Sequence, residues 1–259
     1  MKMPFFITDL TSALSFLTRL RMPDLLMAEM PAGARAAWAY PLAGAIATVL
    51  PAIALAGFVW LGASPLLAAL IAVLISIMIC GGLHEDGLAD AADGLFGGRD
   101  RETALAIMKD SHCGVFGVTA IVLSLLLRAA ALAALVPHYG TTAAALLFIA
   151  AAIAGRGSLV LQWTILPAAR TDGAAATLGR PGVRTTASAE AIALLLCVAL
   201  AIAANAFVQV VAALAFAGFA SLLFSAFVRK RIAGHTGDTL GAAAQIGEIV
   251  FLTTLVIAA

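Results

Sequence analysis

Charge is scarce in this sequence of 259 residues. Charged residues make up 11% of it against 63% that are apolar, and the mean hydropathy is +1.07. Soluble domains carry about 25% charged residues, so the composition excludes an ordinary soluble domain. No charged residue occurs between Arg35 and Glu85, a stretch long enough for two membrane crossings of about 20 residues each. The chain is therefore predicted to be an all-α, polytopic integral membrane bundle.

Cysteine is also rare, and the net charge is only +1. Cys80, Cys113 and Cys197 lie in or beside apolar segments and lack the spacing of metal ligands. They are therefore interpreted as reduced packing residues rather than as a disulfide framework. The balanced net charge gives no indication of a nucleic-acid partner.

The N-terminal segment lacks the features of a cleavable signal peptide. Asp9, Arg19 and Arg21 interrupt its apolar residues, and no small-residue cleavage site follows an apolar core. We expect an amphipathic helix that lies at the membrane interface and ends in the sequence FLTRL.

Apolar segments of about 20 residues, the length that a membrane crossing needs, occupy most of the chain. Turn-forming sequences separate them, such as GASP at 62–65 and PHYG at 137–140. The fifth segment is short and the seventh begins with polar residues, so six to seven spanning helices are expected within one membrane domain, 1–259. The segments are 38–60, 65–83, 114–136, 141–166, 188–204, 207–228 and 241–259.

Lysine and arginine alternate between the loops. The N-terminal segment and the second, fourth and sixth loops hold every basic residue outside the apolar segments, and the other three loops hold none. Basic loops face the cytoplasm in membrane proteins. The N-terminus and all charged loops are therefore predicted to be cytoplasmic.

Half of the acidic residues lie in the 26 residues from Glu85 to Asp110. On a helix, Asp86, Asp90 and Asp93 would share one face within about 60°, because they are spaced i, i+4 and i+7. Like charges so close repel one another unless a cation lies among them, and carboxylates favour a hard ion such as Mg²⁺. Glu85, about 100° away, is a candidate for a supporting or second-metal ligand. The alternative is a solvated loop whose acids face water.

Basic residues follow the acids within the same segment, 81–113. Metal-bound carboxylates flanked by cations such as Arg99 and Lys109 are suited to phosphoryl transfer, because charge must be neutralised on the nucleophile, the centre and the leaving group. Arg101, Glu102 and Lys109 are equally interpretable as interfacial anchors and surface pairs.

Two arginines, Arg128 and Arg156, lie inside apolar segments. Each would cost about 3 kcal/mol or more if it faced lipid, so both are expected to face the bundle interior. There they could hold an anionic group of a substrate, although snorkelling to the interface would also accommodate them.

The last polar stretch, GHTGDTLGAAAQIGE, combines His235 and Asp238 with Gln245 and Glu248. Its start is typical of a tight turn. Asp238 is therefore a candidate metal ligand or general base, with a helix N-cap as the alternative role.

These segments resemble the cobalamin-5'-phosphate synthase family, the adenosylcobinamide-GDP ribazoletransferases. The resemblance rests on GGLHEDGLADAADGLFGG, ALAIMKDSHCGVFG and GHTGDTLGAAAQIGE, together with the N-terminal FLTRL and WAYPLAG, in the same order over nearly the whole chain. It implies a Mg²⁺-dependent enzyme of the bacterial inner membrane. Such an enzyme joins α-ribazole or its 5'-phosphate to adenosylcobinamide-GDP and releases GMP.

Carried over to the matching positions, the resemblance implies His84, Glu85, Asp86, Asp90, Asp93, Lys109, Asp110 and Asp238 as site residues. Their roles, and the addition of Arg99, Arg128, Arg156 and His235, are inferred from the residues themselves. The expected metal ligands are Glu85, Asp86, Asp90 and Asp93, and the expected general base is Asp238 or His84. The residues expected to bind substrate are Arg99, Lys109, Asp110, Arg128, Arg156 and His235.

Two other functions remain open from the residues. A Mg²⁺-dependent phosphatidyl- or prenyl-transferase would use the same acids with a lipid substrate. An anion transporter would use Arg128 and Arg156 as its pathway, but the short neutral turns of one side and the crowding of acids on the other argue against it. The expected partners are the two small-molecule substrates and the lipid bilayer, with no nucleic acid and a possible homo-oligomer.

Overall fold

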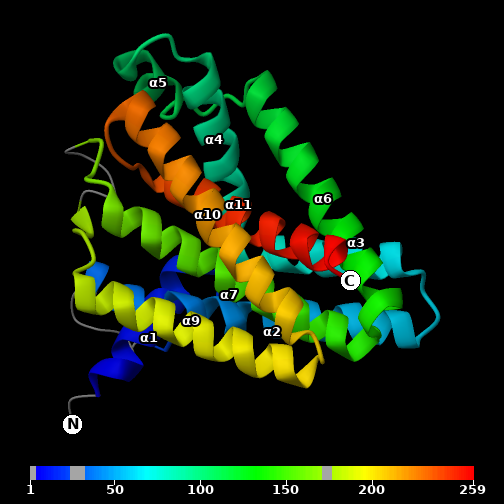
Figure 1. The fold of residues 1–259 in the computed structure, drawn as a ribbon. Coiled ribbons are helices and arrows are strands. Elements are labelled where there is room, and N and C mark those ends of the chain that lie inside the picture. Colours follow the sequence, from blue (N-terminus) through cyan, green and yellow to red (C-terminus); the bar gives the residue numbers. More distant parts are fainter. Residues whose placement is uncertain (1–3, 24–32, 171–176) are drawn as a thin grey trace.

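The computed structural model describes residues 4–23, 33–170 and 177–259, and its regular elements there are helices (Figure 1). The α-helices are α1 (Phe5–Leu17), α2 (Tyr40–Trp60), α3 (Pro65–Cys80), α4 (Leu83–Gly97), α5 (Arg101–Ile107), α6 (Val115–Tyr139), α7 (Thr141–Ile165), α9 (Val183–Ala203), α10 (Phe207–Ile232) and α11 (Gly237–Ile257). A 3₁₀ helix, η2 (Gly33–Ala39), leads directly into α2.

Six helical segments of the described chain are long and apolar enough to cross a membrane: η2 with α2, then α6, α7, α9, α10 and α11. A seventh candidate exists only if α3 and α4 are counted as one span. The expectation of six to seven spanning helices and a short apolar helix at the N-terminus is thus confirmed. The fifth of the seven segments is longer than expected, because α9 begins at Val183 rather than at residue 188.

The apolar segment expected at 65–83 ends early, at Cys80. Gly81 and Gly82 both adopt left-handed backbone conformations, with φ of 64° and 71°, and α4 leaves at 89° to α3. Glycine reaches this region without the steric cost that a Cβ imposes. A Cβ at Gly81 would also lie 2.3 Å from the side chain of Arg19, in the FLTRL sequence. The sharp turn sends the acidic segment away from the axis of α3.

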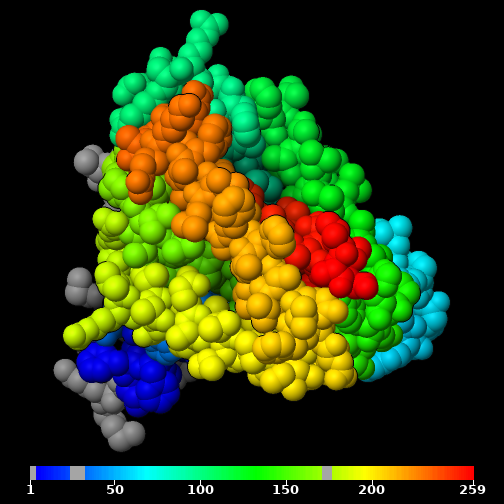
Figure 2. Space-filling view, in the orientation of Figure 1, coloured from blue at the N-terminus to red at the C-terminus, as the bar shows by residue number. Residues whose placement is uncertain are grey.

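Helix α7 lies in the middle of the bundle and is the most buried of the six candidate spans. Helices α2, α9, α10 and α11 pack against it, and α10 crosses the face shown in Figure 2 as a continuous ridge. Many large apolar side chains point outward from the peripheral helices, for example Leu74 of α3, Leu126 of α6 and Phe219 of α10. An apolar exterior of this extent is suited to contact with lipid.

The connections alternate between two ends of the bundle. The neutral turns that follow α2, α6 and α9 gather at one end, at the right and lower right of Figure 1. The acidic segment, the start of α9 and the α10–α11 junction lie at the other end. The polar chemistry of the chain is therefore concentrated at one end.

Candidate active site

Two glycines let α4 and α11 cross closely. A Cβ at Gly87 of α4 would lie 3.0 Å from the carbonyl oxygen of Asp238, and a Cβ at Gly241 of α11 would lie 3.5 Å from the Cα atoms of Gly87 and His84. A side chain at Gly87 would press on the backbone of Asp238, and a Cβ at Gly241 would be in direct van der Waals contact with α4. The crossing therefore brings the acidic motif of α4 against the first turn of α11, about 150 residues later in the chain.

Four carboxylates meet beside this crossing: Asp86, Asp90 and Asp93 from α4, and Asp238 from α11. Helix α4 is not one of the six spans, and its Asp90 has a pKa raised to about 7. Partial burial is the main cause, followed by the negative charges of Asp86, Asp238 and Asp93. The segment is helical, as the acidic spacing requires, and the mutual repulsion of these acids would be relieved by a cation.

Asp93 has a second task in this cluster. It is buried, and its Oδ2 and Oδ1 accept hydrogen bonds from the backbone N–H groups of Gly114 and Gly117, at 2.7 and 2.9 Å. A Cβ at Gly117 would lie 2.3 Å from Asp93 Oδ2, so this contact requires glycine. Asp93 therefore fixes the start of α6 relative to α4, and only its remaining lone pairs are available to a ligand.

The carboxylates fit a shared metal better than a closed metal cage. Among the described residues, no group of three or more His, Cys, Asp or Glu side chains is placed to hold a metal ion by itself. Mg²⁺, however, is commonly bound by one or two carboxylates, with water and substrate phosphate oxygens filling its other positions. Asp86 and Asp90, with Asp238 opposite, form a donor set of this kind.

Asp238 is available to the site because another residue caps its helix. Thr236 is the N-cap of α11: its Oγ1 accepts from the Thr239 N–H, and Thr239 Oγ1 accepts from the Thr236 N–H. Thr236 Oγ1 also donates to Asp238 Oδ2 at 3.1 Å. The alternative of an N-cap role thus applies to Thr236 and not to Asp238.

His235 positions the chain entering α11. Its backbone pairs with Pro167 and Ala169 through two hydrogen bonds of 2.8 Å, forming an isolated bridge to the end of α7. Its ring is buried, and burial together with the charge of Arg180 lowers the pKa of His235 to about 4. A neutral ring at this place argues for a positioning role rather than for binding an anion.

Arg170 is a site residue that the sequence did not single out. Its Nη2 lies 3.7 Å from Asp238 Oδ2, and its Nε and Nη2 are buried without a hydrogen-bond partner among the described residues. Buried guanidinium donors left over in this way are suited to a phosphate group. The only sequence signal was its place in a basic loop, which Arg170 shares with several residues outside the site.

Glu85, Arg128 and Arg156 instead join Glu248 in a buried ion network. Arg128 bonds Glu85 Oε1 and Glu248 Oε1 at 2.9 Å, and Arg156 Nη1 bonds Glu248 Oε2 at 3.0 Å. Gln245 Nε2 donates to Glu85 Oε1 at 2.9 Å. The two arginines and two glutamates neutralise one another within the bundle. We had expected Glu85 to bind a metal and the two arginines to bind substrate, but these side chains form ion pairs with one another and with Glu248 instead.

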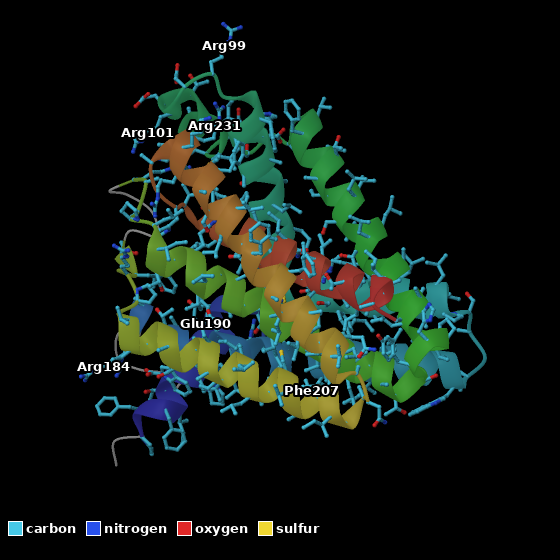
Figure 3. All side chains as sticks on the ribbon, in the orientation of Figure 1. Arg99, Arg101, Arg184, Glu190, Phe207 and Arg231 are labelled. Carbon is cyan, nitrogen blue, oxygen red and sulfur yellow. The ribbon has the colours of Figure 1, made fainter. Side chains whose placement is uncertain are left out.

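Most of the other basic residues lie at the edge of the site or beyond it. Arg99 projects from the top of the molecule in Figure 3, Lys109 is exposed, and Asp110 pairs with His112 at 2.6 Å on the surface. Arg101 donates to the backbone carbonyls of Ala169 and Ile232. It therefore ties α5 to the ends of α7 and α10.

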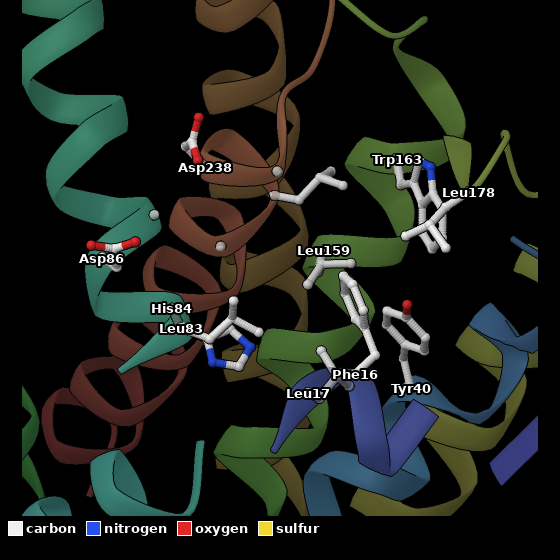
Figure 4. Close-up of a pocket in the computed structure, with 14 residues that line it drawn as sticks. Phe16, Leu17, Tyr40, Leu83, His84, Asp86, Leu159, Trp163, Leu178 and Asp238 are labelled. Atoms are coloured by element: carbon white, nitrogen blue, oxygen red, sulfur yellow. The ribbon is translucent and has the colours of Figure 1, made fainter. Parts of the chain in front are cut away.

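A cavity of about 250 Å³ opens beside the carboxylates (Figure 4). Asp86 and Asp238 stand at one end of it, and Phe16, Tyr40 and Trp163 stand at the other. His84 also lines the cavity and is buried, and its Nε2 has no hydrogen-bond partner in the described part of the chain. Burial, then the charges of Arg156 and Arg128, hold the pKa of His84 well below its ordinary value.

Comparison with known proteins accounts for this arrangement of motifs. A family model described as cobalamin-5-phosphate synthase matches residues 9–256, which include every element of the site described above. The chain belongs to this family. The match runs from α1 into α11, so the N-terminal helix and the last helix are both part of the family's conserved length.

Individual relatives agree with the family assignment. The chain is 43% identical to a protein of Rhizobium johnstonii over 98% of both chains, and 44% identical to one of Rhizobium etli over 98% of both. A protein of Bradyrhizobium diazoefficiens is 42% identical over 95% of this chain and 92% of its own. All three relatives are named adenosylcobinamide-GDP ribazoletransferase. No solved structure matches the chain.

Proposed function

We propose that this membrane protein is an adenosylcobinamide-GDP ribazoletransferase that uses Mg²⁺. The observation that carries the proposal is that Asp86 and Asp238 act electrostatically on Asp90, while Arg170 lies 3.7 Å from Asp238 with buried guanidinium donors that have no hydrogen-bond partner among the described residues. Carboxylates that attract a metal, next to an arginine that attracts a phosphate, meet the electrostatic needs of phosphoryl transfer. The family of the chain supplies the identity of the two substrates.

Asp86 and Asp90 would hold the metal, with Asp238 close enough to support it. When bound, Mg²⁺ would neutralise charge on the pyrophosphate of adenosylcobinamide-GDP and on the departing GMP. Arg170 would donate hydrogen bonds to a phosphate oxygen from the other side. Asp93 would act mainly by holding the start of α6 against the cluster.

The chemical step exchanges the phosphoanhydride bond of the pyrophosphate for a phosphodiester bond. A ribose hydroxyl of α-ribazole, or of its 5'-phosphate, attacks the phosphorus on the cobinamide side of the pyrophosphate. A new P–O bond forms to the ribose, the P–O bond to GMP breaks, and the hydroxyl proton passes to a base of the protein. The products are GMP and adenosylcobalamin, or adenosylcobalamin 5'-phosphate.

Asp238 is the better of the two candidates for that base. It lines the cavity at the same end as Asp86. His84 is buried near Arg128 and Arg156, which oppose its protonation, so it is better suited to a neutral hydrogen bond. The pyrophosphate would bind outside the buried ion network, since Arg128 and Arg156 already have carboxylate partners.

The end of the bundle that holds the acidic segment also indicates which side of the membrane the active site faces. The acidic segment lies at the end where the basic loops gather, which favours a cytoplasmic active site in the bacterial inner membrane. Both nucleotide-like substrates would then reach the site from the cytoplasm.

A turnover assay tests the proposal. Purified protein in lipid is given adenosylcobinamide-GDP and α-ribazole or its 5'-phosphate, first with Mg²⁺ and then with excess chelator. We expect GMP and the cobalamin product in equal amounts with Mg²⁺ and neither with chelator. A folded sample that releases no GMP in Mg²⁺ would contradict the transferase proposal and favour lipid phosphotransfer.

A further inference from the structure

The two ends of the cavity beside the carboxylates differ in polarity. One end is walled by aromatic and leucine side chains, and the other end carries Asp86 and Asp238 (Figure 4). Phe16 and Tyr40 stack with ring centroids 6.2 Å apart, and Tyr40 meets Trp163 at 5.7 Å. Trp163 is held in place by a hydrogen bond of 2.8 Å from its Nε1 to the carbonyl oxygen of Gly179.

The N-terminal motifs converge on this cavity. Phe16 and Leu17 come from the FLTRL sequence, and Tyr40 comes from WAYPLAG. Neither motif supplies a charged side chain to the carboxylate cluster or to the buried ion network. Because both motifs line the cavity, they are expected to have a role other than binding the metal.

We infer that this cavity binds the benzimidazole base of α-ribazole, with the ribose directed toward Asp86 and Asp238. The inference rests on the proposed transferase function. It assigns the acceptor to a particular site and leaves the corrinoid and the GDP outside that site.

Size and polarity select this occupant among the parts of the two substrates. A volume of about 250 Å³ accommodates a fused bicyclic ring and is too small for a corrinoid macrocycle. Guanine carries several donors and acceptors along its edges, and an apolar wall would leave them unpaired at a cost of about 1–3 kcal/mol each. The benzimidazole base has one free ring nitrogen, and the buried His84, whose Nε2 has no partner among the described residues, supplies one polar group.

The orientation also places the reacting group correctly. With the base bound at the aromatic end of the cavity, the sugar reaches the end that carries Asp86 and Asp238, where Asp238 can accept the proton of its hydroxyl. Flat aromatic rings such as Phe16 and Tyr40 favour stacking with a planar base. The alternative occupant, the acyl chain of a lipid, has no polar group that could interact with the carboxylates of Asp86 and Asp238.

Leu159→Trp tests the inference by filling the cavity from α7. A matched control is Leu161→Trp on the same helix, because Leu161 lines a separate cavity with Glu190, between α7, α9 and α10. We expect Leu159→Trp to raise KM for α-ribazole about tenfold or more, while KM for adenosylcobinamide-GDP changes less than about twofold. Leu161→Trp should leave both KM values near those of the wild type.

A second variant guards against misfolding of the first. Phe16 is 44% exposed and lies on α1, so Phe16→Ala removes a stacking surface with little disturbance of the bundle. Calorimetric titration of α-ribazole alone should show weaker binding to Phe16→Ala, by about fivefold to tenfold. This readout does not depend on turnover.

The outcomes separate the two proposals. Turnover by the wild type with no selective loss of α-ribazole binding in either cavity variant would overturn the inference and leave the transferase function standing. A folded wild type that neither releases GMP nor binds α-ribazole would overturn both. A rise in KM for adenosylcobinamide-GDP alone would assign the cavity to the other substrate.

Discussion

Asp90 is the residue on which the charge of the cluster depends most directly. Its pKa near 7 means that the folded protein holds a proton there which the unfolded chain loses near pH 4. Folding stability therefore falls as pH rises from about 4 to 7 and stays at the lower level above pH 7. The carboxylate is partly solvated, so the loss is a fraction of what the shift alone would give.

The variant Asp90→Asn removes this repulsion along with one metal-ligand candidate. In metal-free buffer at pH 8 we expect it to be more stable than the wild type by about 1 kcal/mol, with little difference at pH 4. Turnover in Mg²⁺ should fall by at least about 100-fold. Thermal unfolding at the two pH values and GMP release are the measurements, and marked destabilisation at pH 8 would assign Asp90 a structural role instead.

A separate prediction concerns Arg170, whose buried donors have no hydrogen-bond partner among the described residues although Asp238 lies 3.7 Å away. Arg170→Lys keeps the charge and loses the planar fork of donors. We expect KM for adenosylcobinamide-GDP to rise about tenfold or more with KM for α-ribazole unchanged. Arg184→Lys, at an exposed position in the first turn of α9, is the control. Equal kinetics for the two variants would remove Arg170 from the site.

At the scale of helices, the close crossing of α4 and α11 is the feature that assembles the site. Gly87→Val would place side-chain atoms against the backbone of Asp238, and the helices would have to separate. We expect turnover to fall by at least about 100-fold, because a displacement of about 1 Å already has large effects on catalysis.

The control for this variant is Gly57→Val on α2, where a Cβ would meet no atom within 4 Å. It should fold and turn over like the wild type. If Gly87→Val also kept its full rate, the two helices would not need to be in contact during the reaction.

The buried ion network also connects α4 and α11, because Arg128 bonds both Glu85 and Glu248. Glu248 of α11 bridges Arg128 of α6 and Arg156 of α7, so Glu248→Gln would leave buried positive charge uncompensated. We expect a loss of about 3–5 kcal/mol in the free energy of unfolding. Glu102→Gln, at an exposed pair, should cost less than about 1 kcal/mol. Similar unfolding curves for both variants would contradict a structural role for the network.

The sequence predicted the helices better than it predicted which side chains pair between helices. Hydropathy located most spans, and the spacing of Asp86, Asp90 and Asp93 correctly indicated a helix. The turn at Gly81 and Gly82 was missed because the residues before it stay apolar and the turn depends on packing against Arg19. The pairing of Arg128 with Glu248 joins residues 120 apart in the chain, and residue spacing along one helix carries no information about such a contact.

At the scale of the whole molecule, the account requires the acidic segment to face the cytoplasm. Cys113 is an internal probe of this orientation, because it is exposed in that segment while Cys80 and Cys197 are buried. We expect a membrane-impermeant thiol reagent to label the wild type in permeabilised cells and inverted vesicles but not in intact spheroplasts. Labelling in intact spheroplasts would reverse the predicted orientation.

The matched control places the only exposed thiol at the other end of the bundle. His138→Cys in a Cys113→Ser background puts it at an exposed position in the last turn of α6. This variant should be labelled in intact spheroplasts. Labelling of both proteins from the same side would contradict the alternation of the loops.

The central claim is that carboxylates from α4 and α11 act together on one metal-assisted phosphoryl transfer. The most direct measurement is the initial rate of GMP release at saturating substrates for the wild type, Asp86→Asn and Asp238→Asn, each with Mg²⁺ and with chelator. The account predicts fast release only for the wild type in Mg²⁺, with both variants reduced by at least about 100-fold. Rates for either variant near that of the wild type, or release that persists in chelator, would contradict it.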